Sequence, residues 1–556
     1  MKRTLLTFFT LLLPALLIVV FALNTPLAAH EGDGHEEPET GAPLILGVLD
    51  FPNSGAGAAQ DAFTRGVLLL HSFEFADARA AFLEAQAVDP GFVMAIWGEA
   101  MTLNHPLWAE QDRKEALSVL AKLPPESERK ITPHEQAFLD AVEILYGFGE
   151  ENPGDKPSRD IAYMQAMQRA HETWPDDLEA ASFYGLSILG SVYERDFRTY
   201  MRAAAVLEEV FAKQPRHPGA AHYLIHSYDD QVHAPLGLRA ARVYATIAPA
   251  ASHAQHMISH IYTSLGMWDE VVKANITAVR VSEEAMQRAG KSVANRSKHS
   301  MHWLEYALLQ QGLYEEARKT MQVMKQDRDE LNDLYQNSHY VFFRASYVAD
   351  DPVGEHPLNR IDLPEMSLDY RITDDFATGY SLVAMGKLVE ATSLLGEMQG
   401  RIASATVKTV EEGLHEDKLA TSEDAYLVAS IMARELEALL MYRDGKTDAA
   451  IELLRAAAAD ENGRALVYGP PHIPKPPNEL LGEMLLAQGR PEEAIKKFDL
   501  SLSRNTNRSL ALLGLARAQE ATGNLKAAAE TQALLASNWK GDLQAFRQSA
   551  YPWLGD

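Results

Sequence analysis

A period of 34 residues recurs along this chain of 556 residues and constrains its fold more than any other feature. Residues 65–90, RGVLLLHSFEFADARAAFLEAQAVDP, space small and aromatic residues as two helices in contact require. The turn between two such helices returns later in the segments LGMWDEVVKA, QGLYEEARKT, MGKLVEATSL, DGKTDAAIEL, QGRPEEAIKK and TGNLKAAAET. Gly489 and Gly523 of the last two turns are 34 residues apart (523 − 489 = 34). The pattern predicts stacked helix pairs over most of residues 59–540.

This series resembles the tetratricopeptide repeat, in which two antiparallel helices make one unit. The resemblance implies an all-α solenoid, a right-handed superhelix of helix pairs whose first helices line the concave face, here with irregular inserts. Three longer stretches, HPGAAHYLIHSYDD, KHSMHWLEYALLQQG and YGPPHIPKPPNELLGEMLLAQG, are more specific. They resemble a family of large exported bacterial tetratricopeptide proteins with histidine-rich first helices and no settled activity.

The N-terminus has the composition of a secretory signal peptide. Lys2 and Arg3 precede an apolar run, and small residues lie just before His30. An uncleaved membrane anchor is the alternative. The predicted order of segments is a signal peptide (1–29), an acidic flexible leader (30–58), an N-terminal repeat array with a histidine-lined groove (59–344), a Pro/Asp-rich insert (345–372), a C-terminal repeat array (373–540) with a Pro-rich loop at 469–477, and a C-terminal tail (541–556).

Composition narrows the compartment and the partners. The chain has no cysteine, so disulfides are excluded and metal ligands are limited to His, Asp and Glu. Export without disulfides indicates the periplasm or the surface of a bacterium. The formal net charge is 51 − 77 = −26, which repels nucleic acid and anionic lipid. We therefore expect no nucleic-acid partner, and no membrane contact beyond a possible N-terminal anchor.

Histidines cluster on three successive first helices. Counted from Pro218, Ser252 and Lys298, they stand second, fifth or ninth in their repeats, which are groove-facing positions in tetratricopeptide proteins. The seven are His222, His226, His253, His256, His260, His299 and His302. Histidines four residues apart project from one helix face, and neighbouring helices pack about 8–10 Å apart. Imidazoles from two helices can therefore meet around one ion.

We predict a divalent transition metal, either zinc, copper, nickel or iron, in this cluster. The expected ligands are His222, His226, His256, His260 and His302. Supporting or alternative ligands are His253, His299 and Asp229. The competing interpretation is a polar seam, in which the imidazoles hydrogen-bond carbonyls, tyrosines and one another.

Other polar residues fall on groove positions of further repeats. They are Tyr306, His71, His105, Glu479 and Glu483. The last two follow the Pro-rich stretch YGPPHIPKPPNE. That stretch either lies in the groove as an internal ligand or connects two repeats outside it.

The function expected from these features is that of an exported scaffold. Its groove would bind a polypeptide or a small polar ligand, with the histidine cluster shaping or metallating that face. The alternative is a metal-dependent enzyme, a hydrolase or an oxidoreductase, or a metal carrier. Standard protein-only catalysis is poorly supported, since HYLIH and HMISH lack the glutamate of metalloprotease helices and no G-x-S-x-G motif is present.

Overall fold

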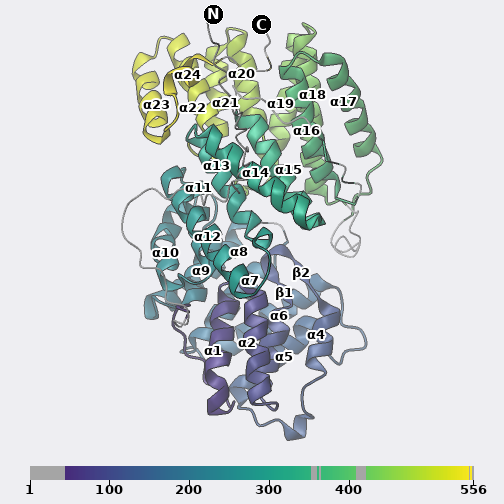
Figure 1. The fold of residues 1–556 in the computed structure, drawn as a ribbon, viewed down its shortest axis with the longest axis vertical. Coiled ribbons are helices and arrows are strands. Elements are labelled where there is room, and N and C mark those ends of the chain that lie inside the picture. The colour runs from purple at the N-terminus through teal and green to yellow at the C-terminus, as the bar shows by residue number, and fades with distance from the viewer. Residues whose placement is uncertain are drawn as a thin grey trace, which may run out of the picture. The chain divides into compact units, whose positions relative to one another are not determined.

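The structure is a computed structural model, and it describes residues 44–193, 195–351, 360–361, 363, 365–408, 421–549, 551 and 553. The predicted signal peptide and residues 30–43 of the predicted leader lie outside the described residues. The chain divides into two units, Met1–Leu44 and Ile45–Asp556, and every element below belongs to the second unit. Within it, helices account for nearly all regular structure (Figure 1).

Among the described residues before Lys298, four short 3₁₀ helices and one small hairpin accompany the α-helices. The 3₁₀ helices are η1 (Gly57–Ala59), η2 (Pro106–Trp108), η3 (Glu126–Glu128) and η4 (Val293–Asn295). The strands β1 (Asn104–His105) and β2 (Glu110–Gln111) pair antiparallel, with His105 opposite Glu110. The α-helices are α1 (Gln60–His71), α2 (Phe75–Val88), α3 (Val93–Met101), α4 (Arg113–Leu120), α5 (Pro133–Tyr146), α6 (Lys156–Thr173), α7 (Leu178–Gly190), α8 (Phe197–Lys213), α9 (Pro218–Ser227), α10 (Ala234–Ile247), α11 (Ser252–Ser264) and α12 (Trp268–Arg288).

The remaining helices continue the same alternation. They are α13 (Lys298–Gln310), α14 (Tyr314–Leu331), α15 (Leu334–Asp350), α16 (Leu368–Ala384), α17 (Leu388–Ala403), α18 (Glu423–Arg443), α19 (Thr447–Gly463), α20 (Pro477–Ala487), α21 (Pro491–Arg504), α22 (Ser509–Ala521), α23 (Leu525–Asn538) and α24 (Leu543–Gln548). Both α15 and α16 reach into the predicted insert 345–372.

Helix pairs stack in the manner of tetratricopeptide repeats. From α1 to α23, each helix packs on the next along the chain, and the first helices α7, α9, α11 and α13 also contact one another in series. This stacking brings equivalent positions of successive first helices together on one face. The all-α solenoid of stacked helix pairs expected from the sequence is confirmed.

The turns between paired helices explain the glycine of the repeat motif. Gly489 and Gly523 have φ of 68° and 78°, a left-handed conformation that side chains with a Cβ disfavour. The first repeat has Phe73 in the equivalent place, also left-handed with φ 55°. A non-glycine residue there stores about 1–3 kcal/mol of strain, which its surroundings must offset.

The folded part of the chain begins before residue 59. Leu46 and Phe51 are buried, and the Phe51 ring lies 5.5 Å from that of Trp97 and 4.9 Å from that of Phe138. The Val48 amide donates to the Arg216 carbonyl at 3.1 Å. Leu46 and Phe51 are therefore packed against the repeats, although residues 30–58 were expected to form a flexible leader, because these two apolar side chains find a surface there.

The C-terminal repeats contact the middle of the array. Trp268 Nε1 donates to the Asn507 carbonyl at 3.2 Å, and the Lys540 amide donates to the Gln311 carbonyl at 2.8 Å. Nearby, the buried Arg508 guanidinium binds Glu479 Oε2 at 2.8 Å and Asp350 Oδ2 at 3.0 Å. Residues more than 150 positions apart along the chain are thus joined by buried charges.

The Pro-rich loop lies against inner-face residues of earlier repeats. Gly469 is so close to Trp303 that a Cβ on it would lie 2.1 Å from the indole, and the Tyr468 ring is 5.3 Å from that of His260. Lys475 Nζ donates to Glu479 Oε1 at 2.8 Å and to Glu483 Oε1 at 2.6 Å. These contacts favour the interpretation of the loop as an internal occupant of the groove.

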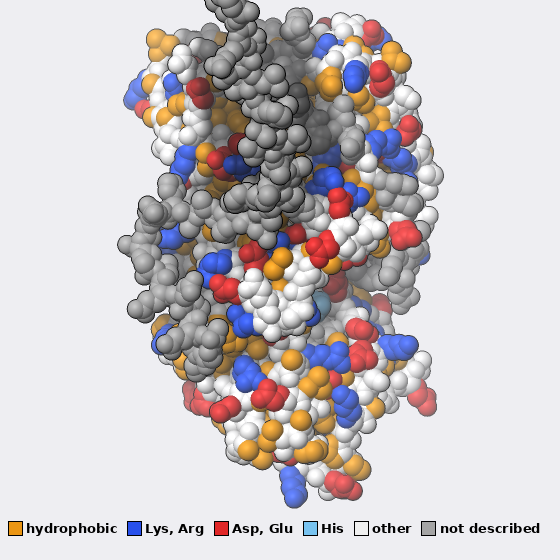
Figure 2. Space-filling model, in the orientation of Figure 1, with side chains coloured by type: hydrophobic (Ala, Val, Ile, Leu, Met, Phe, Trp, Pro, Cys, Tyr) orange, Lys and Arg blue, Asp and Glu red, His pale blue; other side chains and the backbone are white. Residues whose placement is uncertain are grey.

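The exterior is mixed in character. On the face seen in Figure 2, acidic, basic and hydrophobic side chains are interspersed. Within the described part of the chain, no helix combines the length and apolar character that a membrane span requires.

Replacing Arg508 tests the contact between the C-terminal repeats and the middle of the array. Arg508→Ala leaves the buried Asp350 without its cation and Glu479 with Lys475 alone, so we expect the free energy of unfolding to fall by about 3–5 kcal/mol. Urea denaturation followed by circular dichroism measures it. Arg490→Ala, which breaks a half-exposed pair with Glu493, is the matched control and should change stability little. Equal effects of the two changes would contradict the predicted role of Arg508.

Candidate metal centre

Histidine and carboxylate side chains converge at three places among the described residues. We name them the α11–α13 triad (His256, His260, His299), the α9–α11 triad (His222, His226, His253) and the Glu179 triad (His71, Glu179, His217). Within each triad, one ligand atom from every residue lies within 4.8 Å of the others. The hydrogen positions that their partners impose distinguish the three chemically.

The α11–α13 triad is built by two neighbouring first helices. His256 and His260 are one turn apart on α11, and His299 reaches them from the start of α13. The first two are 1% exposed, and His299 is half-buried. The His299 and His256 rings are 4.5 Å apart between centroids. Three imidazoles therefore share one largely buried space.

Outer partners fix the hydrogens of His256 and His260. His256 Nδ1 lies 2.7 Å from Asn275 Oδ1, while Asn275 Nδ2 donates to the Val271 carbonyl, so the amide presents its oxygen to the imidazole. His260 Nδ1 lies 2.6 Å from Asp229 Oδ2. Both acceptors are buried, and both require a hydrogen on Nδ1. In the neutral rings, each Nε2 is then left with a lone pair.

Those two Nε2 atoms face each other at 2.9 Å. Two lone pairs at this distance repel, and burial removes the water that would screen them. A cation between the two nitrogens turns the repulsion into attraction. The cation can be a proton or a metal ion, and an outer acceptor on Nδ1 is also the usual arrangement of metal-binding histidines.

The α9–α11 triad has the same form. His222 Nδ1 donates to the His71 carbonyl at 2.7 Å, so its Nε2 has a lone pair in the neutral ring. That atom is 3.1 Å from His226 Nε2 and 3.1 Å from His253 Nε2. Three ring nitrogens therefore converge on a common point.

The Glu179 triad differs because its hydrogens satisfy every contact. The two oxygens of Glu179 accept from His71 Nε2 at 2.7 Å and from His217 Nε2 at 2.9 Å. His71 Nδ1 accepts from the Tyr223 hydroxyl, and His217 Nδ1 accepts from the Ala220 amide as the N-cap of α9. No lone pair faces another, so this cluster is a hydrogen-bonded seam and not a candidate metal site.

Burial controls the protonation of these groups. It lowers the pKa of His222 to about 3, and it lowers the pKa of His256 well below the ordinary value, helped by the charge of His260. Burial alone would raise the pKa of Glu179, but the charges and hydrogen bonds of His217 and His71 lower it to about 2. Near neutral pH, His222 and His256 are therefore neutral, and Glu179 is an anion.

The structure distributes the predicted residues differently from a single cluster. His302 joins neither histidine triad: its Nε2 is 3.3 Å from Ser346 Oγ, and its ring packs on Phe342 and Phe343. His253 and His299, expected in support, are instead the third members of the triads. Asp229 lies behind His260, as a supporting residue would.

The remaining predicted groove residues serve other contacts. The Tyr306 hydroxyl accepts from Arg508 Nη1 at 3.3 Å. Glu479 and Glu483 share Lys475, and Glu483 also accepts from Trp553 Nε1 at 2.9 Å. The His105 ring stacks on Phe75 with centroids 4.1 Å apart, and its Nδ1 lies 3.3 Å from Glu110. Of the five predicted residues, only His71 contacts one of the two histidine triads, because its carbonyl accepts from His222 Nδ1.

Three further residues escaped the sequence analysis: Glu179, His217 and Asn275. Glu179 stands second in the helix that begins at Leu178, the register that His253 and His299 occupy, and this position was the available signal. His217 precedes a proline at the start of α9, where an N-cap is expected. Asn275 lies on a second helix, α12, so groove periodicity could not indicate it.

Aromatic rings wall the two histidine triads. The strained Phe73 places its ring 4.4 Å from that of His222 and 5.6 Å from that of His253. Trp303 stacks on His260 at 5.2 Å, with Tyr468 on the same imidazole. These rings exclude water from the nitrogens and so strengthen the interactions among them.

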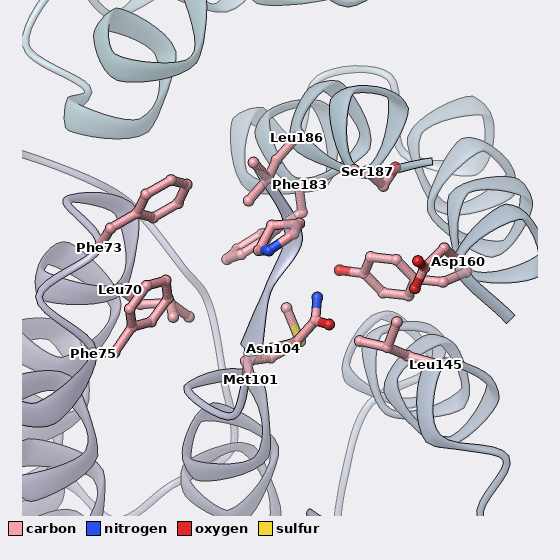
Figure 3. Close-up of a pocket in the computed structure, with 13 residues that line it drawn as sticks. Leu70, Phe73, Phe75, Met101, Asn104, Leu145, Asp160, Phe183, Leu186 and Ser187 are labelled. Carbon is pink, nitrogen blue, oxygen red and sulfur yellow. The ribbon is translucent and has the colours of Figure 1, made fainter. Parts of the chain in front are cut away.

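An apolar cavity lies on the other side of Phe73. Phe73 and Phe75 line one side, and Asp160 lies across from them (Figure 3). The cavity volume is about 20 Å³, which is room for only one or two water molecules. Asp160 is already bound by Lys156 Nζ at 2.6 Å and by the Tyr193 hydroxyl at 2.5 Å. The cavity is therefore too small for a substrate in this conformation.

No protein-family model and no curated protein matches the sequence. Solved structures align with most of it at low identity. The tetratricopeptide domain of P58(IPK) is 12% identical, with 84% of this chain and 99% of that domain covered and a TM-score of 0.23. The Cut9–Hcn1 hetero-tetramer of APC/C gives 14% identity, 83% and 76% coverage and a TM-score of 0.34. The human IFIT1 dimer with m7Gppp-AAAA is 12% identical, with 86% of this chain and 90% of that chain covered and a TM-score of 0.33. Similarity at this level carries no functional conclusion.

The Glu179 triad makes a direct prediction for stability. Glu179→Gln presents an NH₂ group to one of the two imidazole N–H groups, so one buried contact is lost. We expect the free energy of unfolding to fall by roughly 2–4 kcal/mol in urea denaturation. Glu172→Gln on the exposed face of α6 is the control and should be close to neutral. A neutral Glu179→Gln would show that the seam does not depend on the carboxylate.

The same triad predicts how stability depends on pH. Burial lowers the pKa of His71 below 6.5, so the unfolded chain gains a proton before the folded one as the pH falls. Glu179 acts in the same direction at lower pH, since its pKa falls from 4.5 to about 2 on folding. The urea midpoint, measured with chelator present, should therefore decrease from pH 7.5 to pH 5. His71→Gln should show a smaller decrease, and an identical profile would contradict the prediction.

Proposed function

We propose that this chain is a helical-repeat scaffold that holds a divalent transition metal ion on its inner, first-helix face at the α11–α13 triad. One observation carries the proposal. The Nε2 atoms of His256 and His260 lie 2.9 Å apart, while Asn275 and Asp229 hold the hydrogens of both rings on Nδ1. This arrangement needs a cation between the nitrogens.

A metal ion fits the triad better than a proton does. A proton on His260 Nε2 would form an imidazolium paired with Asp229, and it would satisfy the two facing nitrogens. His299, however, brings a third imidazole to the same space. A proton joins two nitrogens, whereas a metal ion joins three or four.

The ligands indicate the class of metal. Imidazole nitrogen suits zinc, copper, nickel and iron, whereas magnesium and calcium prefer oxygen. Nitrogens about 2.0–2.1 Å from a tetrahedral ion lie about 3.3–3.4 Å from each other. The Nε2 atoms of His256 and His260 are 2.9 Å apart, so they need to separate by only a few tenths of an ångström to reach that geometry.

The scaffold part of the proposal concerns what else the groove binds. The Pro-rich loop contacts His260 and Trp303, so the chain itself occupies the inner face beside the triad. This favours a small polar ligand over an extended polypeptide at this stretch of groove. Export to a bacterial periplasm or cell surface, expected from residues 1–29, is part of the same proposal, and the intact mass of the mature protein would test it.

Removing a ligand should remove the ion. We expect His256→Ala to lower bound Zn²⁺ by one equivalent per chain, because two remaining imidazoles no longer hold the ion in three directions. The measurement is the metal content after dialysis against Zn²⁺. Zn²⁺ should also raise the melting temperature of the parent protein, since it binds the folded state, and chelator should reverse the increase.

His171→Ala is the matched control, since His171 is a half-buried helical histidine outside the triads. It should leave the Zn²⁺ content unchanged. If the histidines instead form only a hydrogen-bonded seam, the folded parent protein will retain no Zn²⁺, and chelator will not change its melting temperature. That result would reject the metal and leave the scaffold.

A further inference from the structure

The α9–α11 triad repeats the α11–α13 triad position by position. In each, the fifth and ninth residues of one first helix meet the second residue of the next first helix. The paired positions are 34 residues apart (256 − 222 = 34), but the third members are 46 apart (299 − 253 = 46). The long helix α12 and η4 absorb the extra residues, and the structure returns His299 to the same register. The repeat geometry has therefore built one arrangement twice.

In the α9–α11 triad too, the hydrogens of neutral imidazoles cannot satisfy every contact between ring nitrogens. His222 Nε2 has one lone pair, because Nδ1 donates to the His71 carbonyl. Two other ring nitrogens, on His226 and His253, each lie 3.1 Å from it. One lone pair accepts one well-aligned hydrogen, so neutral rings cannot satisfy both contacts. A cation placed among the three nitrogens satisfies all of them.

The two triads are adjacent. The His226 and His260 rings are 6.0 Å apart between centroids, and the His253 and His256 rings are 6.2 Å apart. Within the triads, the rings of His222 and His226 are 4.8 Å apart, as are those of His256 and His260. Helix α11 contributes to both triads, since His253 belongs to one and His256 to the other.

We infer that the α9–α11 triad is a second metal site, so that the chain holds two divalent transition metal ions side by side along α11. The inference rests on the proposed function, because it uses the same chemistry at the neighbouring triad. It adds a stoichiometry of two and places each ion on three neutral imidazoles. Phe73 on one side and Trp303 on the other enclose the pair.

The first test is stoichiometry. His30 and His35, near the N-terminus, are replaced by alanine in every sample, so that they cannot add background binding. Zn²⁺ content after dialysis should then be two per chain. His222→Ala and His256→Ala should each retain one ion, and the double variant none. His171→Ala, the control outside the triads, should retain two.

A second variant protects the test against misfolding. His253 is only half-buried, so His253→Gln keeps a polar side chain at the site and disturbs packing less than His222→Ala. Far-ultraviolet circular dichroism confirms folding. His253→Gln should also retain one ion, and its melting temperature with excess chelator should be close to that of the parent.

The second test is proximity. Loaded with Cu²⁺, the parent protein should give an electron paramagnetic resonance spectrum broadened by coupling between two ions. His253→Gln and His256→Ala should each give the spectrum of an isolated Cu²⁺ with nitrogen ligands. Two uncoupled Cu²⁺ signals in the parent protein would overturn the side-by-side arrangement.

The outcomes separate this inference from the proposed function. One ion that His256→Ala removes and His222→Ala retains overturns the second site but leaves the first. One ion that either variant removes means a single shared site, which also overturns the inference. No bound ion in the folded parent overturns both proposals. Two ions lost one at a time support the inference.

Discussion

The facing Nε2 atoms of His256 and His260 set the constraint on which the inner face of this solenoid depends. Asn275 and Asp229 take both Nδ1 hydrogens, so the neutral rings present two lone pairs to each other at 2.9 Å. Water cannot relieve this contact, because both imidazoles are buried. The requirement for a cation follows from the number of hydrogens and does not depend on any assumption about activity.

Two properties of the fold produce and protect this arrangement. Stacked first helices bring positions two, five and nine of successive repeats together, which creates the same triad twice. The C-terminal repeats and the Pro-rich loop then contact the same face, through Arg508 at one point and Tyr468 at another. Enclosure of this kind lowers the local dielectric, so each imidazole interacts more strongly with its neighbours than it would in an open groove.

The repeat period made much of this predictable. Turns such as QGRPEEAIKK indicated the helix pairs, and the offset of 34 residues indicated that the two histidine pairs share a face. The sequence placed His302 among the ligands and His253 and His299 in support, whereas His253 and His299 complete the triads and His302 lies against Ser346. Sequence spacing does not give the stagger between neighbouring helices, so it could not distinguish these positions. Contacts such as that of Arg508 with Asp350 were not predictable, since the curvature of the array that joins residues 158 positions apart has no local sequence signal.

The Glu179 triad shows how small a chemical difference separates a structural cluster from a candidate metal site. All three clusters are buried or nearly so, and each uses histidines from stacked first helices or the caps that begin them. In the Glu179 triad, one carboxylate accepts a hydrogen from each of two imidazoles, and all contacts are satisfied. In the two histidine triads, an imidazole stands in place of that carboxylate. The two acceptor oxygens are lost, and the lone pair of a further ring nitrogen is added. The hydrogens of neutral rings no longer suffice, and a cation, which we propose is a metal ion, is needed to complete the cluster.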